Sequence, residues 1–530
     1  MKKRMMALLL ASCMILGTTA CGGKGKGTIS YEVSDEPVTI TYYYDNGGGG
    51  VQQYTKQVEE RLNEILKETE GYEHITIELY PSGSHQRDLT LAQASGDPVD
   101  LISTWGLDLN TMIKNGDFIE LEGLMEQFPD VVSEIPEWIV DYGKVWDHQY
   151  FIPTYQQVSN LQFFAVPQEY VDMYNKAYGT TEEDISKLVT SGTLEDKLDF
   201  LEDLCLAVRK YSGSEDKWIF PEHNWVNHSN TYSSAYFNQE YILNQQFSNW
   251  IMREGADGPE YWGYTEDFKT IMERYADWYQ RGLLHPECST IDYQKFTEKN
   301  FLNDASYVNL FIGDTCTEES LKDYLSDIYE MPMNVFRTSE HAYVPSEWEA
   351  GGHAIGADCE HPAEAMMIIE LLRTEKGKEF YNTLVYGLEG IHWEWVDKEN
   401  DRITTLEYEG SQGGSGTSTY SNYKWSTGNV FNAWKNQSFR EGYYDYIVDD
   451  VEKGEDTVFS SAMGIAWDVS EVKNQFIQVT AVETEYKRTI YTADNWEERY
   501  NEYIEKLEAA GLKDILKELN QQYQDVLKSK

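Results

Sequence analysis

The chain has 530 residues, and its 91 Asp and Glu residues against 43 Lys and Arg residues give a formal net charge of −48 at pH 7. So acidic a protein repels nucleic acid and anionic lipid head groups, which excludes both as partners. Hydrophobic residues at 41% and aromatic residues at 14% exclude a disordered chain, and the length predicts at least two domains.

The N-terminus has the order of a secretory signal. Basic residues at positions 2–4 precede an apolar run at 5–16 and a group of small residues that leads to Cys21. The apolar run is too short to cross the roughly 30 Å hydrocarbon core of a membrane as a helix. We therefore predict a signal peptide over residues 1–20.

The residues at the predicted cleavage site, Thr18-Thr19-Ala20-Cys21, resemble a lipobox, the motif whose cysteine is lipidated and becomes the new N-terminus. Thr18 stands where this motif usually has leucine. The glycine- and lysine-rich residues that follow are typical of a flexible tether, which we place over residues 21–35. The resemblance implies lipidation of Cys21, and an ordinary secretory signal with an incidental cysteine is the alternative.

The first part of the mature chain alternates strand and helix patterns. Aromatic and β-branched residues at 38–44 lead into Asp45-Asn46 and four glycines, which predicts a buried strand followed by a loop. An amphipathic helix, a second strand, a helix and a third strand follow at residues 51–70, 74–80, 87–94 and 99–102. This order is typical of a parallel α/β sheet.

Ligands of parallel α/β sheets bind beyond the carboxyl ends of the strands. This rule points to Tyr44 and Asp45 after the first strand and to Trp105 after the third. Asp45 is able to accept hydrogen bonds from hydroxyl groups, although capping the glycine turn is an equally simple role. Trp105 is either a residue of the binding cleft or an ordinary core tryptophan.

The rest of the chain gives fewer patterns. We predict helices at 197–211, 265–281 and 362–373, a strand-like stretch at 348–357 broken by Gly351-Gly352, and an exposed low-complexity loop at 410–419. Residues 495–530 predict two helices split at Gly511, with an apolar stripe that docks on the body of the protein.

Motifs for catalysis and metal binding are missing from the sequence. The cysteines beyond the tether are widely spaced with no CxxC pair, so we interpret Cys205, Cys288, Cys316 and Cys359 as small buried residues and leave their disulfide state open. The ten histidines show no ligand spacing, and no EF-hand loop, nucleophile elbow or phosphate-binding loop is present. We therefore expect no catalytic residue, no metal and no cofactor.

Four motifs in chain order resemble those of family 1 extracellular solute-binding proteins. Residues 96–102, Gly-Asp-Pro-Val-Asp-Leu-Ile, resemble their small-Gly-Asp-x-x-Asp element, and residues 116–121 are similar to their G-x-x-x-x-L segment. Residues 142–153 resemble their D-G-K-x-Y-x-x-P element, with Tyr142 in place of Asp. Residues 282–287, Gly-Leu-Leu-His-Pro-Glu, match their G-L-I-x-P-E element.

Two further motifs narrow the resemblance to large Gram-positive lipoproteins of the LipO type. Residues 386–393 resemble their G-x-E-G-x-x-Y signature, with Trp393 at the last position. The tail at 509–523 is similar to the end helices of that subgroup, which carry a DUF3502-type domain. The resemblance extends over nearly the whole mature chain.

The resemblance implies an α/β type II periplasmic-binding-protein fold, with two lobes joined by a hinge and a ligand in the cleft between them. The chain would cross between the lobes near Pro153 and again near Gly351-Gly352. We assign residues 36–152 and 353–395 to lobe 1, and residues 153–352 and 396–530, with the C-terminal helices, to lobe 2.

The 39 tyrosines and 15 tryptophans suggest the class of ligand. A sugar ring presents a flat apolar face and a rim of hydroxyls, so its site needs an aromatic platform beside carboxylate or amide groups. Such pairs are Tyr155-Gln156 and Trp348-Glu349, one at each predicted crossover. Trp225 lies in an aromatic, amide-rich stretch that we place in lobe 2 facing the cleft, and the alternative interpretation of this stretch is a surface loop. The predicted ligand-binding residues are Tyr44, Asp45, Trp105, Tyr155, Gln156, Trp225, Trp348 and Glu349.

Three other residues of the C-terminal half receive structural interpretations. Glu389 is interpreted as a hydrogen-bonded structural residue, and Trp393 and Trp395 as packing. We predict that the protein is a monomeric lipoprotein, held at the extracellular face of the membrane by its lipid anchor. We further predict that it captures a carbohydrate and docks on the permease subunits of an ABC importer. A surface glycoside hydrolase or lyase, and the same fold with a peptide-like ligand, are the alternatives.

Overall fold

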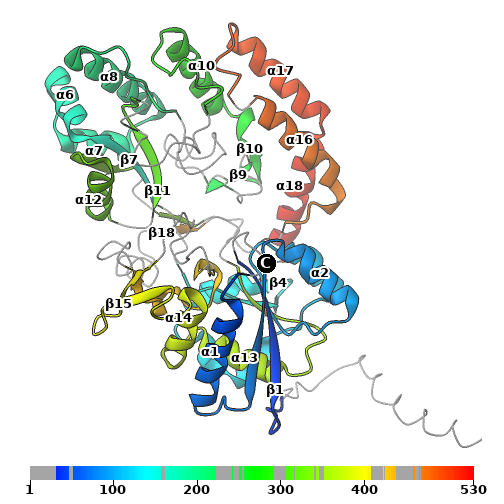
Figure 1. Ribbon diagram of the computed structural model, residues 1–530. Coiled ribbons are helices and arrows are strands. Elements are labelled where there is room, and N and C mark those ends of the chain that lie inside the picture. Colours follow the sequence, from blue (N-terminus) through cyan, green and yellow to red (C-terminus); the bar gives the residue numbers. More distant parts are fainter. Residues whose placement is uncertain are drawn as a thin grey trace, which may run out of the picture.

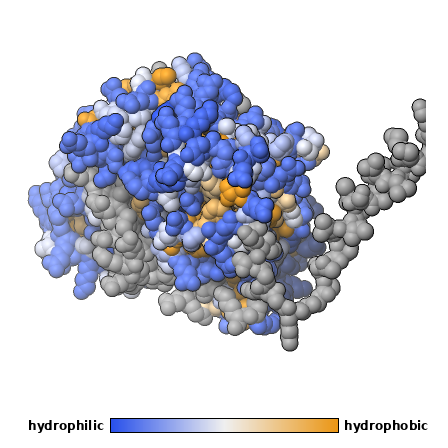
Figure 2. Space-filling view, turned by 90° about the horizontal axis from the view of Figure 1, so that it is seen from below, coloured by the Kyte–Doolittle hydropathy of each residue, from blue (hydrophilic) through white to orange (hydrophobic). Residues whose placement is uncertain are grey.

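A computed structural model shows two lobes (Figure 1). It describes residues 31–46, 52–156, 161–221, 241–242, 250–252, 256–291, 302, 306–314, 317–338, 342–344, 351–406, 420, 422, 424–436, 457–459, 465, 467–486 and 488–529. Seen from the lobe 1 end (Figure 2), the surface of these residues is mostly hydrophilic, as the acidic composition predicts. Among the described helices, none combines the length and the apolar character needed to span a bilayer.

Lobe 1 is built on a five-stranded sheet in the order β2-β1-β3-β14-β6. Strands β1, β2 and β3 are parallel, and β14 runs antiparallel to β3 and β6. The bounds are Val38–Asp45 for β1, Ile75–Ser82 for β2, Leu101–Ser103 for β3, Phe151–Pro153 for β6 and Gly352–Ile355 for β14. The predicted parallel strands are therefore confirmed.

Helices cover this sheet with their apolar side chains, from one face in α1 and from nearly all sides in the buried α13. Helix α1 (Thr55–Glu68) buries Val58 and Leu62 against the sheet, as predicted from its helical spacing. The same core receives side chains from α13 (Pro362–Leu371) and α14 (Lys378–Tyr386). Helix α2 (His85–Ser95) begins directly after the loop that follows β2.

The lobe 1 core extends past residue 395, where we had placed the last crossover. Ile403, Tyr420 and Trp434 are buried in the same cluster as the strands of the large sheet. A small sheet consists of β15 (Trp393–Asp397), β16 (Arg402–Thr405) and β17 (Lys435–Asn436). Ile403 lies in β16, and Tyr420 and Trp434 lie between β16 and β17 in the sequence. The assignment of the described residues among 396–436 to lobe 2 is corrected by this packing, because Ile403, Tyr420 and Trp434 pack with α14 in the lobe 1 core.

Lobe 2 is built on an antiparallel sheet in the order β11-β7-β12. The bounds are Leu161–Pro167 for β7, Leu310–Asp314 for β11 and Met333–Arg337 for β12. The chain reaches this sheet after Pro153 of β6 and returns to lobe 1 at Gly352 of β14. Helices α6 (Gln168–Tyr178), α7 (Glu182–Ser191), α8 (Leu194–Ser212), α10 (Glu266–Gln280) and α12 (Glu318–Tyr329) surround it.

Capping explains where two of these helices begin. Thr181 and Thr193 each accept a hydrogen bond from the backbone three residues on, and Asp184 and Asp196 bond back to the caps. Among the described cysteines, Cys205 and Cys288 are buried as predicted and Cys359 is half-buried, whereas Cys316 lies outside the described residues.

The C-terminal helices α16 (Lys473–Tyr486), α17 (Trp496–Ala509) and α18 (Leu512–Ser529) pack on lobe 2. Leu507, Ile515 and Leu519 are fully buried in the cluster that contains the core of α8 and α10. Gly511, at φ +99°, separates α17 from α18. The predicted pair of docked end helices is confirmed.

Candidate ligand-binding edge

The ends of five strands meet at one edge of the lobe 1 sheet. Strands β1, β2, β3 and β6 finish there and β14 begins there, because β14 runs in the opposite direction. The chain leaves this edge for lobe 2 after β6 and returns to it at β14, so the edge faces the other lobe. This is the position at which open α/β sheets bind ligands.

Asp45 and Trp105 come together at this edge. A Cβ placed on Gly106 would lie 3.9 Å from Asp45 Oδ2, and one placed on Gly351 would lie 2.8 Å from the Trp105 backbone nitrogen. Gly351 also has a positive φ of +64°, so the missing side chain permits both the turn and the close approach. Asp45 and Trp105 are half-buried, which leaves part of the carboxylate and indole accessible.

Backbone hydrogen bonds hold the loops of this edge in place. Thr104 N donates to Gly352 O at 2.9 Å and Thr154 N donates to Gly351 O at 3.1 Å. Tyr155 exchanges bonds with a loop of lobe 1, donating from its nitrogen to Gly428 O and accepting from Val430 N, each at 2.9 Å. Backbone hydrogen bonds therefore hold both loops that flank Gly351, the loop after β3 that carries Trp105 and the loop after β6 that carries Tyr155.

His85 belongs to the same edge, although the sequence analysis did not select it. Its Nε2 lies 2.7 Å from Ser103 O, and its side chain is 3% exposed. Burial lowers the pKa of His85, against the opposing effects of the Ser103 carbonyl and the Asp45 charge. It follows the carboxyl end of β2, so the strand-end rule used for Asp45 and Trp105 would also have found it.

A buried polar layer supports the edge from below. Tyr42 Oη lies 3.0 Å from His353 Nε2, and Arg373 donates to Ile152 O at 2.7 Å. Burial lowers the pKa of Arg373 to about 9, and burial together with the Arg373 charge lowers the pKa of His353 well below its ordinary value. Burial and the Arg373 charge therefore both favour the neutral form of His353, which lies on β14.

The predicted residues at this edge differ in burial. Tyr44 is 1% exposed and stacks on Tyr42 with ring centroids 4.9 Å apart, which is the environment of a core residue. Tyr155 packs edge-on against Phe431 at 4.7 Å, and Gln156 is largely buried. As contacts of a ligand, all of them stay predictions, and Trp225, Trp348, Glu349 and the lipidation site Cys21 lie outside the described residues.

One group of described side chains has the spacing of metal ligands, which the sequence did not predict. His148 Nδ1 lies 3.2 Å from Glu122 Oε1 and 3.5 Å from Glu120 Oε2. The histidine follows the turn between β4 (Lys144–Val145) and β5 (His148–Gln149), before β6 begins, and therefore near the opposite edge of the sheet. The three side chains are about half exposed, as in a surface ion pair.

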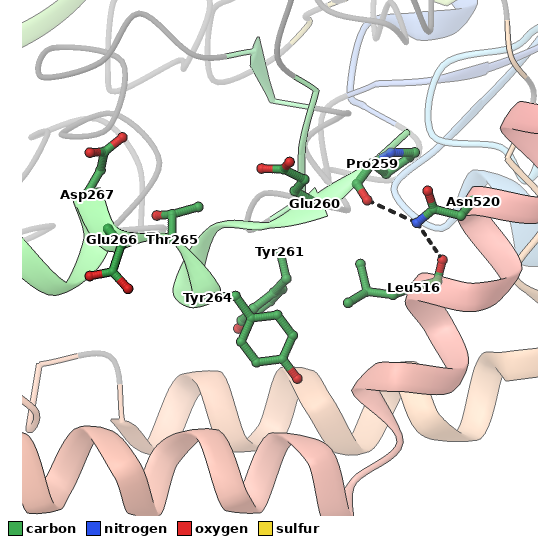
Figure 3. Close-up of a pocket in the computed structure, with 9 residues that line it drawn as sticks. All are labelled: Pro259, Glu260, Tyr261, Tyr264, Thr265, Glu266, Asp267, Leu516 and Asn520. Carbon is green, nitrogen blue, oxygen red and sulfur yellow. Dashed lines mark hydrogen bonds between the residues drawn. The ribbon is translucent and has the colours of Figure 1, made fainter. Parts of the chain in front are cut away.

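A hollow of about 510 Å³ lies between lobe 2 and helix α18 (Figure 3). Strand β10 (Glu260–Tyr261) and the following turn form one wall. Asn520 of α18 crosses between the walls, donating to Pro259 O at 3.0 Å and to Leu516 O at 2.9 Å. The hollow therefore lies where the C-terminal helices pack on lobe 2, and none of its lining residues belongs to the strand-end edge of lobe 1.

Comparison with known proteins agrees with this architecture. The family model described as a domain of unknown function, DUF3502, matches residues 461–528, where the resemblance implied such a region. A curated protein of Streptococcus pneumoniae, described as a carbohydrate ABC transporter substrate-binding protein, is 20% identical over 542 residues, which cover 100% of this chain and 99% of that protein.

Solved structures share the fold over almost their whole length. The N-glycan transport solute binding protein NgtS of S. pneumoniae matches with a TM-score of 0.66 and 18% identity, covering 93% of this chain and 99% of that one. The S. pneumoniae substrate binding protein FusA in complex with kestose matches with a TM-score of 0.55 and 15% identity, over 93% and 100% of the two chains. The predicted resemblance is confirmed: the chain has the two-lobed fold of the extracellular solute-binding proteins of ABC importers and ends in a DUF3502 region.

Proposed function

We propose that this protein captures a neutral carbohydrate, an oligosaccharide, in the cleft between its lobes and delivers it to the permease of an ABC importer. The observation that carries the proposal is that Asp45 and Trp105 stand at the carboxyl ends of neighbouring strands, at the sheet edge that faces lobe 2. The indole offers a stacking surface for the apolar face of a sugar ring, and the carboxylate accepts hydrogen bonds from its hydroxyls.

The relatives support the same class of ligand. The curated relative is described as a carbohydrate-transport protein, and the matched structures include NgtS with Man1GlcNAc and FusA with kestose. The remaining predicted contacts, Tyr44, Tyr155, Gln156, Trp225, Trp348 and Glu349, complete the proposed site. Of these, Tyr44 would contribute through the core beneath the edge, given its burial.

In this proposal the protein binds and releases its ligand without chemistry. The mature chain is a monomer at the extracellular face of the membrane, tethered through lipid on Cys21. The predicted tether of residues 21–35 is shorter than proposed, because Tyr31 and Ser34 bond to Gln127 and Glu364 of lobe 1. Ligand binding brings the lobes together, and the permease recognises the closed form. The hinge segments are those that leave Pro153 and return to Gly351.

The test is a thermal-shift screen of neutral mono- and oligosaccharides, because a ligand of the native state raises the melting temperature by mass action. For the best hit, we expect Trp105→Ala and Trp348→Ala each to weaken binding at least tenfold, about 1.4 kcal/mol. Trp146→Ala is the control, since Trp146 is 55% exposed in the β4–β5 turn, near the opposite edge.

Two results would contradict the proposal. If Trp105→Ala and Trp348→Ala both bind as tightly as the parent protein, the carbohydrate does not occupy this edge. If the purified protein converts the oligosaccharide to shorter products, the chain is an enzyme rather than a binding protein.

A further inference from the structure

A groove of about 570 Å³ lies on lobe 1, away from the strand-end edge. Its walls come from α1, α14, the small sheet of β15 to β17, and the turn between α14 and β15. We call it the tryptophan groove, and its lining residues include Arg61, Glu379, Glu389, Trp393, Trp395 and Trp434.

The three tryptophans form a continuous aromatic surface in this groove. Trp434 lies 4.5 Å from Trp393 and 4.7 Å from Trp395 between ring centroids, and Trp393 lies 5.1 Å from Trp395. Trp393 and Trp434 are 4% and 7% exposed, so they fix the third ring in place. Trp395 is half-buried and offers its accessible part to the groove.

The turn of the Gly-Leu-Glu-Gly motif forms one rigid wall. Trp393 Nε1 donates to Gly387 O at 3.1 Å, and Leu388 N donates to His392 Nδ1 at 2.8 Å. Gly387 has φ +79°, and a Cβ there would lie 2.5 Å from His392 Nδ1. The turn therefore holds Glu389, which is exposed, at the rim of the groove.

The charges of the rim are balanced. Three cationic and three anionic side chains line the groove, and two oppositely charged pairs lie in contact: Arg61 with Glu379 at 2.6 Å and Lys378 with Asp401 at 2.8 Å. A groove with no net charge in a chain of −48 favours an uncharged ligand. Charged groups paired in this way still donate to and accept from hydroxyls.

We propose that the tryptophan groove is a second saccharide-binding site, which takes a short stretch of a neutral oligosaccharide. The volume lies within the range of small-molecule sites, roughly 300–1,000 Å³. All its lining residues belong to lobe 1, so the groove does not depend on lobe closure. The choice of saccharide as ligand class rests on the proposed function, whereas the site itself does not overlap the edge. Its ligand would bind more weakly than that of the cleft, because the groove is open on one side.

The test uses the mature protein labelled with 5-fluorotryptophan and observed by fluorine NMR. The Trp395 signal is assigned by its loss in Trp395→Phe. Maltotriose, mannotriose and kestose are titrated up to tens of millimolar. We expect a saturable shift of the Trp395 signal with at least one trisaccharide, and we expect that shift to persist in Trp105→Ala.

Trp395→Ala would remove packing as well as a stacking surface, so it would not separate ligand binding from local stability. Variants of the groove rim are used instead. Glu389→Ala leaves the three rings and their contacts in place, whereas Lys398→Ala removes the ammonium group that lies 5.5 Å from the Trp395 ring centroid. Both variants are expected to weaken the affinity measured at Trp395 several-fold, and Glu389→Ala should do so without lowering the melting temperature. Glu399→Ala is the control, since Glu399 is exposed on the neighbouring turn and does not line the groove.

The outcomes distinguish the two proposals. No shift of Trp395 with any of the three trisaccharides, or a shift unchanged in both rim variants, overturns the groove and leaves the cleft proposal standing. A shift of Trp395 that is lost in Trp105→Ala also overturns it, because the event then reports the cleft. A shift that weakens in the rim variants and persists in Trp105→Ala supports the groove, whereas the cleft is tested separately by the thermal shift of Trp105→Ala and Trp348→Ala.

Discussion

The sheets of the two lobes differ in the direction of their strands, and this difference is the basis for placing the proposed ligand site in lobe 1. In lobe 1 the parallel strands bring Asp45, His85 and Trp105 to one edge. In lobe 2 the antiparallel β11-β7-β12 sheet has no such edge, and its strands are buried under helices. The proposed site in lobe 1 is therefore built where strands end, and lobe 2 is a helical body braced by the C-terminal helices.

The largest effect should come from removing a core side chain in either lobe. Leu62 and Leu519 are both fully buried, one in each core, and replacing either by alanine should cost roughly 2–5 kcal/mol of unfolding free energy. Because the two cores are separate clusters, we expect hydrogen exchange to rise mainly in the lobe that carries the substitution. Equal rises in both lobes would mean that they unfold as one unit.

Next in size is the effect of a side chain at Gly351. Gly351→Ala places a Cβ within 3.0 Å of the Trp105 backbone at a positive φ, so packing and backbone strain together should cost about 2–4 kcal/mol in urea unfolding. It should also weaken ligand binding by displacing Trp105. Gly71→Ala has a similar φ and open space around it, so it should show the smaller backbone effect alone. Equal losses in the two variants would argue against a tight contact at the edge.

The buried histidines of lobe 1 should make this lobe sensitive to acid. Burial lowers the pKa of His85, and burial and Arg373 lower that of His353, so the folded state holds fewer protons than the unfolded state below about pH 6.5. The contribution of these two histidines to the free energy of unfolding is therefore fully present above that pH and is lost as the pH falls through their lowered pKa values. His353→Gln should flatten the dependence in lobe 1. A dependence as steep as that of the parent protein would contradict this assignment.

Local patterns in the sequence predicted the strands and helices of lobe 1 because each carries its own period, as in residues 38–44 and α1. The strand-end rule then put Asp45 and Trp105 at the same edge. The rule also selected Tyr44 as a ligand contact, although Tyr44 is a core residue. Its burial depends on packing with residues far along the chain, such as Tyr420, which the local pattern of the strand does not indicate. The return of Trp434 to lobe 1 and the approach of His148 to Glu122 are tertiary contacts, which no local pattern indicates.

The smallest effect concerns the contact between the two lobes. Lys114 lies in the last turn of helix α3 (Leu109–Asn115) of lobe 1, and its ammonium group pairs with Asp468. The backbone of Asp468 in turn exchanges hydrogen bonds with the side-chain amide of Gln522 in α18. The pair is 43% and 32% exposed, so Lys114→Ala should shift the balance between lobe arrangements by only about 0.2–1 kcal/mol, less at high salt. Fluorophores on the two lobes would measure the change by energy transfer.

Acid should act on this contact in the same direction as the substitution. Burial raises the pKa of Asp468, but hydrogen bonds from Lys114 and Ser470 outweigh it and hold that pKa below its ordinary value. The contribution is therefore present above about pH 4 and is lost as the pH falls through the lower pKa of the paired carboxyl. Lys513→Ala is the control, because Lys513 pairs with Glu508 at 2.7 Å within the C-terminal helices. A change in energy transfer as large in Lys513→Ala as in Lys114→Ala would mean that net charge, rather than the contact between α3 and the DUF3502 region, sets the lobe arrangement.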